Sequence, residues 1–115
     1  MKVHVKTATP AQLDWLVAKC EGYKSIWTDG RLRPVSRTGM DVESTWPAYT
    51  TRPEHMQPIM EREGIATAKP NSKGWVAHNY LFGRYVSGQT MLVAAARCYI
   101  LGNLGDEAEV PEELK

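Results

Sequence analysis

The stretch that most constrains the fold of this chain is residues 91–104, which is apolar almost throughout. Gly88-Gln89-Thr90 precedes it, Gly105 follows it, and Arg97 is its one charged residue. Threonine caps helices at the N-terminus and glycine ends them, so we predict a helix between Thr90 and Gly105. A helix that is apolar on nearly all sides is buried on more than one side. The second cover is then either the first helix of the chain or another copy of the protein.

Residues before this helix alternate in a way that is typical of strands. We expect the central strand over residues 75–80, with short strands over 65–68 and 84–86 on either side in the sequence. Residues 69–74 have the composition of a turn.

A complete start signal predicts another helix near the N-terminus. Thr9, Pro10 and Gln12 form the pattern of a capping box with proline in the first turn. Apolar residues then recur at helical spacing up to Gly22, which ends the helix. They are Leu13, Leu16, Val17 and Cys20.

The middle of the chain reads as a hairpin, a long loop and a broken helix. Asp29-Gly30 separates the segments 23–27 and 31–35, which predicts a β-hairpin. Residues 36–53 show no sustained period and predict a long loop, which is more often a functional surface than a plain connection. We expect Pro58 to interrupt the helical segment that Pro53 opens, leaving two turns before Gly64.

Composition indicates one globular domain with an acidic end. The chain has 115 residues, of which 43% are hydrophobic and 23% charged. The last ten residues hold five acidic side chains against Lys115, so residues 1–105 carry 13 basic and 8 acidic side chains, a net charge of +5. We therefore divide the chain into a domain, residues 1–105, and an acidic C-terminal tail, residues 106–115. The tail either frays in solvent beyond Pro111, or it folds over a basic surface or competes with an anionic ligand for that surface.

Several classes of protein are disfavoured. No apolar run approaches the roughly 20 residues that span a bilayer, and no signal-peptide core follows the first residues, so we expect a cytoplasmic protein without a membrane partner. We expect no metal, cofactor or catalytic residue, because the two cysteines read as reduced core residues and the histidines lack the spacing of metal ligands. These residues are Cys20, Cys98, His4, His55 and His78.

A basic and aromatic surface is the candidate for ligand or partner binding. Arginine forks, hydroxyls and aromatic faces suit a phosphorylated or nucleobase-bearing ligand. The competing interpretation is a solvated hairpin edge that charge protects from strand pairing. A net charge of +5 is too small to argue for tight, non-specific nucleic-acid binding. The candidate residues, on the hairpin and the long loop, are Arg31, Arg33, Arg37, Trp46, Tyr49, Thr50, Thr51, Arg52 and His55.

Several segments keep a characteristic order and spacing along the chain. They are Leu13 to Gly22, Pro58 to Ile65, Trp75-x-Ala77, Gly88-x-Thr90 with Ala94 to Tyr99, and Gly105-Asp106-Glu107. Together they resemble the NinX family of small proteins encoded by tailed phages and their prophages. The resemblance implies a phage or prophage origin and a compact αβ sandwich, and it implies no activity because the family is uncharacterised. Where that family usually has Ser-Thr-Asp-Trp, this chain has Thr50-Thr51-Arg52-Pro53, which implies a changed ligand preference if the segment lines a site.

We therefore expect an α+β fold in which a small, mostly antiparallel sheet packs with two long helices, one N-terminal and one C-terminal. The expected function is that of a non-enzymatic accessory protein that binds a host or phage macromolecule in the bacterial cytoplasm. The alternative is a protein that binds or sequesters a small anionic ligand such as a nucleotide signal, and an enzyme is the third reading. The apolar last helix also predicts a homodimer.

Overall fold

The structure is a computed structural model that describes residues 1–28, 30–35, 46–72, 74–79 and 85–114. Its strands form three antiparallel sheets, β1–β7, β2–β3 and β4–β5–β6. The predicted α+β class is confirmed, although the strands divide among three sheets and the third helix, α2, is as long as α1. In chain order the elements are β1 (Lys2–His4), η1 (Val5–Thr7), α1 (Pro10–Cys20), β2 (Lys24–Thr28), β3 (Arg31–Val35), α2 (Pro53–Glu63), β4 (Ile65–Asn71), β5 (Gly74–Asn79), β6 (Tyr85–Gly88), α3 (Met91–Leu104), β7 (Glu107–Glu109) and η2 (Glu112–Leu114).

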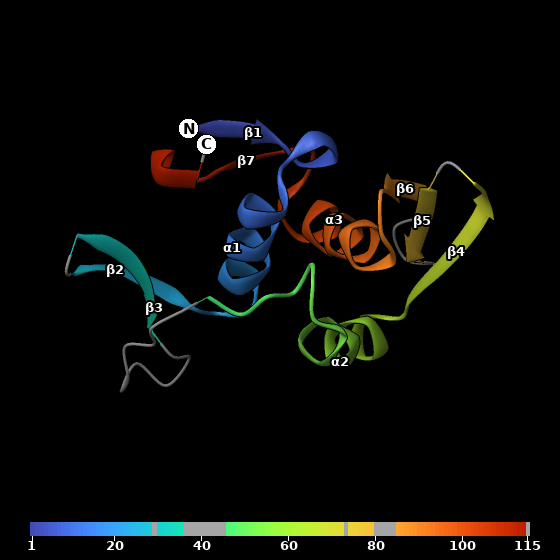
Figure 1. The fold of residues 1–115 in the computed structure, drawn as a ribbon, viewed down its shortest axis with the longest axis horizontal. Helices are drawn as coiled ribbons and strands as arrows, with labels where there is room; N and C mark the ends of the chain where they lie inside the picture. The colour runs from blue at the N-terminus through green and yellow to red at the C-terminus, as the bar shows by residue number, and fades with distance from the viewer. Residues whose placement is uncertain (29, 36–45, 73, 80–84, 115) are drawn as a thin grey trace.

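Helix α3 lies at the centre of the molecule, with the β4–β5–β6 sheet on one side, α1 on the opposite side and α2 below it in the view of Figure 1. The Thr90 hydroxyl accepts a hydrogen bond of 3.1 Å from the Val93 amide, and the helix ends before Gly105, as predicted. Ala95 is fully buried, and so are its two alanine neighbours. The cover that the apolar helix needs thus comes from its own chain. The homodimer is predicted because the apolar helix needs a cover that a second copy could supply. That reason no longer holds, and the homodimer stays a prediction.

Gly88 explains how closely the sheet approaches α3. A Cβ atom at this position would lie 2.5 Å from the backbone nitrogen of Ala94. Because real Cβ atoms do not come so near a backbone atom, the end of β6 and the first turn of α3 can meet here only through a residue without a side chain.

Helix α1 begins at the predicted capping box. Thr9 Oγ1 accepts from the Gln12 amide at 3.3 Å, and Gln12 Oε1 accepts from the Thr9 amide at 2.9 Å. The apolar stripe of α1 is buried against α3, with Leu13, Leu16 and Val17 fully covered. This packing forms the main core of the protein.

Helix α2 is continuous through Pro58, so the predicted interruption is wrong. The amide that proline lacks would have bonded to the carbonyl of Glu54, which lies in the exposed first turn where water can satisfy it. Met56 and Ile59 are buried one turn apart and hold the helix against the core. Gly64 ends the helix in the left-handed conformation, with φ of 69°, as glycine there predicts.

The chain after Gly105 differs from the solvated tail that its charge suggested. Strand β7 pairs with β1, with Val3 opposite Ala108, and both Ala108 and Val110 are buried. The sequence Glu107-Ala108-Glu109-Val110 alternates exposed and buried residues, so its acidic side chains face solvent while its apolar ones pack. The packed body therefore continues past residue 105.

Candidate functional site

The β2–β3 hairpin carries the first group of candidate residues and projects from the body beside α1 (Figure 1). The hairpin is in the predicted place, with Trp27 opposite Leu32 and Thr28 opposite Arg31. The side chain of Trp27 is 59% exposed and that of Ile26 is 41% exposed. Large apolar side chains are therefore presented to solvent on the strand that precedes the candidate arginines.

A hollow of about 380 Å³ lies against this hairpin. Trp46 closes one side, and its indole Nε1 donates a hydrogen bond of 3.2 Å to the Leu32 carbonyl. The ring of Trp46 also lies edge-on to Trp15 of α1, with centroids 6.4 Å apart, so the hollow is tied to the core. The wall is mainly apolar and carries two arginines and one glutamate: Trp27, Gly30, Arg31, Leu32, Arg33, Trp46, Glu113 and Leu114.

The second group of candidates lies on the turn that leads into α2. Tyr49 and Thr50 are 5% and 3% exposed, so they anchor this turn and offer little surface to a ligand. The Thr50 amide donates a hydrogen bond of 2.8 Å to Asp14 Oδ1 on α1. Burial raises the pKa of Asp14, while the hydrogen bonds from Thr50 and the neighbouring His55 act in the opposite direction.

The remaining candidates on this turn face solvent. Thr51, Arg52 and His55 are exposed, and His55 Nδ1 accepts a hydrogen bond of 2.9 Å from the Ala48 amide. The structure thus brings Arg31, Arg33 and Trp46 together at one hollow and places the second group on a separate surface. The predicted residue Arg37 lies outside the described residues.

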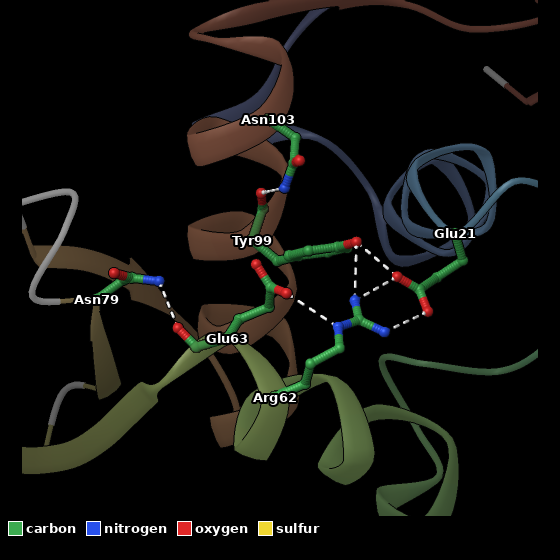
Figure 2. Close-up of polar contacts among 6 residues, drawn as sticks. All are labelled: Glu21, Arg62, Glu63, Asn79, Tyr99 and Asn103. Carbon is green, nitrogen blue, oxygen red and sulfur yellow. Dashed lines mark hydrogen bonds and ion pairs between the residues drawn. The ribbon is translucent and has the colours of Figure 1, made fainter.

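A polar network that sequence analysis missed joins the three helices (Figure 2). Arg62 of α2 binds Glu21 at the end of α1, and its Nε donates to Glu63 Oε2 at 2.9 Å. The Tyr99 hydroxyl of α3 donates a 2.5 Å hydrogen bond to Glu21 Oε2. Burial and this bond to a carboxylate both raise the pKa of Tyr99.

The periphery of this network extends it to the sheet. The Asn79 amide of β5 donates to the Glu63 carbonyl at 2.7 Å, and that of Asn103 donates to the Tyr99 carbonyl at 2.8 Å (Figure 2). Since every member binds another element or its own helix, we interpret the network as a brace between helices. The signal that could have found it is the placement of Glu21 and Arg62 at helix ends, but no local spacing links them.

Other kinds of site find no support in the part of the chain that the structure describes. In those residues no group of three or more His, Cys, Asp and Glu side chains is placed to hold a metal ion. Among the described helices, none has the length and apolar character needed to cross a membrane.

The fold defines a small α+β domain, and the hairpin carries a mainly apolar hollow on its surface. The sequence model of the family described as bacteriophage P22 NinX matches residues 8–103. This match covers most of the chain, so the chain belongs to that family of phage proteins, as the sequence resemblance indicated. No curated protein matches the chain.

Proposed function

We propose that this phage-family protein is an accessory protein that acts inside the bacterial host by binding a host or phage protein, with the β2–β3 hairpin as its contact surface. The observation that supports this proposal is the exposure of Trp27, at 59%, beside an apolar hollow. Tryptophan and arginine are the residues most enriched among those that dominate binding energy at protein interfaces. The hairpin combines both types on one projecting element.

The charges of the hairpin favour a partner segment that is acidic. Arg31 is exposed and Arg33 half-buried at the wall of the hollow, and Lys24 is exposed on the neighbouring strand. A carboxylate can accept two parallel hydrogen bonds from one guanidinium, which gives orientation as well as attraction. An acidic peptide with one large apolar side chain would place that side chain in the hollow and its carboxylates on the arginines.

The acidic C-terminal segment of the chain lies at the same place. Glu113 and Leu114 contribute to the wall of the hollow, and Gln12 Nε2 holds the Leu114 carbonyl at 2.8 Å. An acidic residue followed by leucine has the chemistry expected of the partner. This juxtaposition supports the idea that the segment competes with the partner for the hairpin arginines.

The test is affinity capture from phage-infected host cells with the wild-type chain and four variants. Trp27→Ala and Arg31→Glu change the hairpin, while Tyr85→Ala removes a 71% exposed aromatic ring from β6 and Arg52→Glu makes the same charge change on the second candidate surface. We expect one protein to be retained by the wild type, Tyr85→Ala and Arg52→Glu and to be lost with both hairpin variants. Thermal unfolding of each variant serves as the folding control.

Two results would contradict this proposal. Equal capture by Trp27→Ala and the wild type would exclude the hairpin as the contact surface. Loss with Arg52→Glu alone would instead assign binding to the turn that leads into α2.

A further inference from the structure

A second hollow, of about 320 Å³, is lined by residues of β5, of β6 and of α3 with the segment just before it. Strands β5 and β6 lie at the end of the molecule opposite the hairpin (Figure 1). None of its residues belongs to the surface discussed above. Its wall includes Trp75 of β5, Gln89 just before α3, and Arg97 on α3.

Arg97 gives this hollow a positive charge that no acidic side chain neutralises among the described residues. Two of its guanidinium nitrogens donate to backbone carbonyls, one to Ser87 at 3.0 Å and one to Ala8 at 3.1 Å. Its Nε is buried and has no hydrogen-bond partner in the part of the chain that the structure describes. A half-buried cation held only by neutral groups is poorly compensated and favours an anion nearby.

The burial of Arg97 agrees with this view, because loss of water lowers the pKa of its guanidinium and no opposing charge restores it. The two carbonyl bonds also fix the side chain in place. The cation is therefore held in position before any ligand arrives, which reduces the entropy cost of binding.

The rest of the wall suits a flat ring. Trp75 is half-buried, and an indole offers a planar apolar surface on which heteroaromatic rings stack. Gly74 and Gly88 adjoin it without side chains, and a Cβ on Gly74 would lie 3.0 Å from the Gly88 carbonyl oxygen. The exposed Gln89 adds an amide that can donate and accept hydrogen bonds.

We propose that this hollow binds a small anion that carries a planar heteroaromatic ring, namely a nucleoside monophosphate, with the phosphate at Arg97 and the base at Trp75. A volume of about 320 Å³ is at the lower end of the range for small-molecule sites, so it suits one base and one phosphate. Nucleotide binding at this site is an activity additional to the proposed function. It is compatible with that function because the partner would bind the hairpin at the other end of the molecule.

Isothermal titration calorimetry of the full chain with each of the four common ribonucleoside monophosphates tests the proposal. We expect at least one of them to bind. The matching nucleoside and ribose 5-phosphate should each bind at least about tenfold more weakly, since each lacks one of the two recognised groups. Inorganic phosphate that binds as tightly as the nucleotide would overturn the assignment of the base to Trp75.

Gln89→Glu is the decisive variant, because it places a negative charge at the hollow on an exposed residue. We expect about tenfold weaker nucleotide binding from repulsion of the phosphate. Gln57→Glu makes the same change at an exposed position of α2 and should leave binding unaltered. Trp75→Leu should weaken binding to a similar extent, with thermal unfolding as its folding control.

The proposal is overturned if no mononucleotide binds at millimolar concentration, or if Gln89→Glu binds as tightly as Gln57→Glu. Trp27→Ala should bind nucleotide like the wild type. Failure of the hairpin proposal and failure of this one are therefore separate results.

Discussion

Arg62 and Glu21 form an ion pair with two hydrogen bonds, in which the Glu21 side chain is almost buried and the Arg62 side chain is about half exposed. Arg62 donates bonds of 3.1 and 2.6 Å to the two carboxylate oxygens, and the side chains are 49% and 8% exposed, respectively. The carboxylate has therefore given up most of its water, while the guanidinium has kept much of its own. Removing Arg62 would leave Glu21 as an uncompensated buried charge, whereas removing Glu21 would leave Arg62 partly hydrated. Loss of Arg62 should therefore destabilise the protein more than loss of Glu21.

The first prediction concerns this pair. Arg62→Met should lower the free energy of unfolding by about 1–3 kcal/mol, because Glu21 keeps a buried charge without its cation. Glu61→Gln, one residue earlier on an exposed position of α2, should change it by less than about 0.5 kcal/mol. Urea unfolding of both variants measures the difference, and equal stabilities would show that the pair is not a brace.

The second prediction concerns pH and Tyr99. An unfolded tyrosine ionises near pH 10, and burial with the bond to Glu21 raises the pKa of Tyr99 above that value. Below about pH 10 both states keep the proton and the contribution to stability is complete. Above it the unfolded state releases its proton first, so the contribution is lost as the pH rises through the folded pKa.

The stability of the wild type should therefore fall more steeply than that of Tyr99→Phe between about pH 10 and pH 12. The comparison of the two proteins removes the effects of the cysteines and the other tyrosines, which both share. Parallel pH curves from urea unfolding would contradict the raised pKa of Tyr99.

The third prediction concerns the packed face of α3. Ala95→Asp should cost about 3 kcal/mol or more, because Ala95 is fully buried and the carboxylate would find no partner there. Leu104→Asp adds the same charge at a position that is 39% exposed near the end of the helix, and it should cost about 1 kcal/mol or less. Calorimetric melting compares the two, and a normal melt for Ala95→Asp would place α3 at the surface.

The fourth prediction concerns the two thiols, both free in the structure. Burial and the adjacent Glu21 raise the pKa of Cys20 to about 11, and burial raises that of Cys98. Because the thiolate is the reactive form, native protein at pH 8 should react with iodoacetamide far more slowly than protein unfolded in urea. Rapid labelling of Cys20 in the native state would refute this, and mass spectrometry identifies the modified site.

Much of this fold could be predicted from local signals, because each of them involves only a few neighbouring residues and can be recognised without knowledge of tertiary contacts. The capping box at Thr9, the Asp29-Gly30 signal between β2 and β3 and the Thr90 cap each lie within such a short stretch. The exceptions depend on tertiary context. Pro58 is tolerated because Met56 and Ile59 are buried on either side of it, and packing of this kind has no short-range signature.

The candidate site was predicted in part. The hairpin arginines and Trp46 do line one hollow, because Arg31 and Arg33 lie on the same strand, β3, and the Trp46 indole donates a hydrogen bond to the carbonyl of Leu32 between them. Tyr49 and Thr50 are buried, and the Thr50 amide donates to Asp14, 36 residues earlier in the sequence. Sequence spacing alone could not show that the arginine of α3 and the indole of β5 line a common hollow.

The pairing of β1 with β7 has a consequence for synthesis on the ribosome. Lys2 lies opposite Glu109, so β1 is synthesised well before β7, the strand that closes its edge. Until then the nascent chain presents an unpaired strand, which is a template for association with other chains. Closure of this small sheet therefore cannot begin until β7 has left the ribosome, long after β1 has done so.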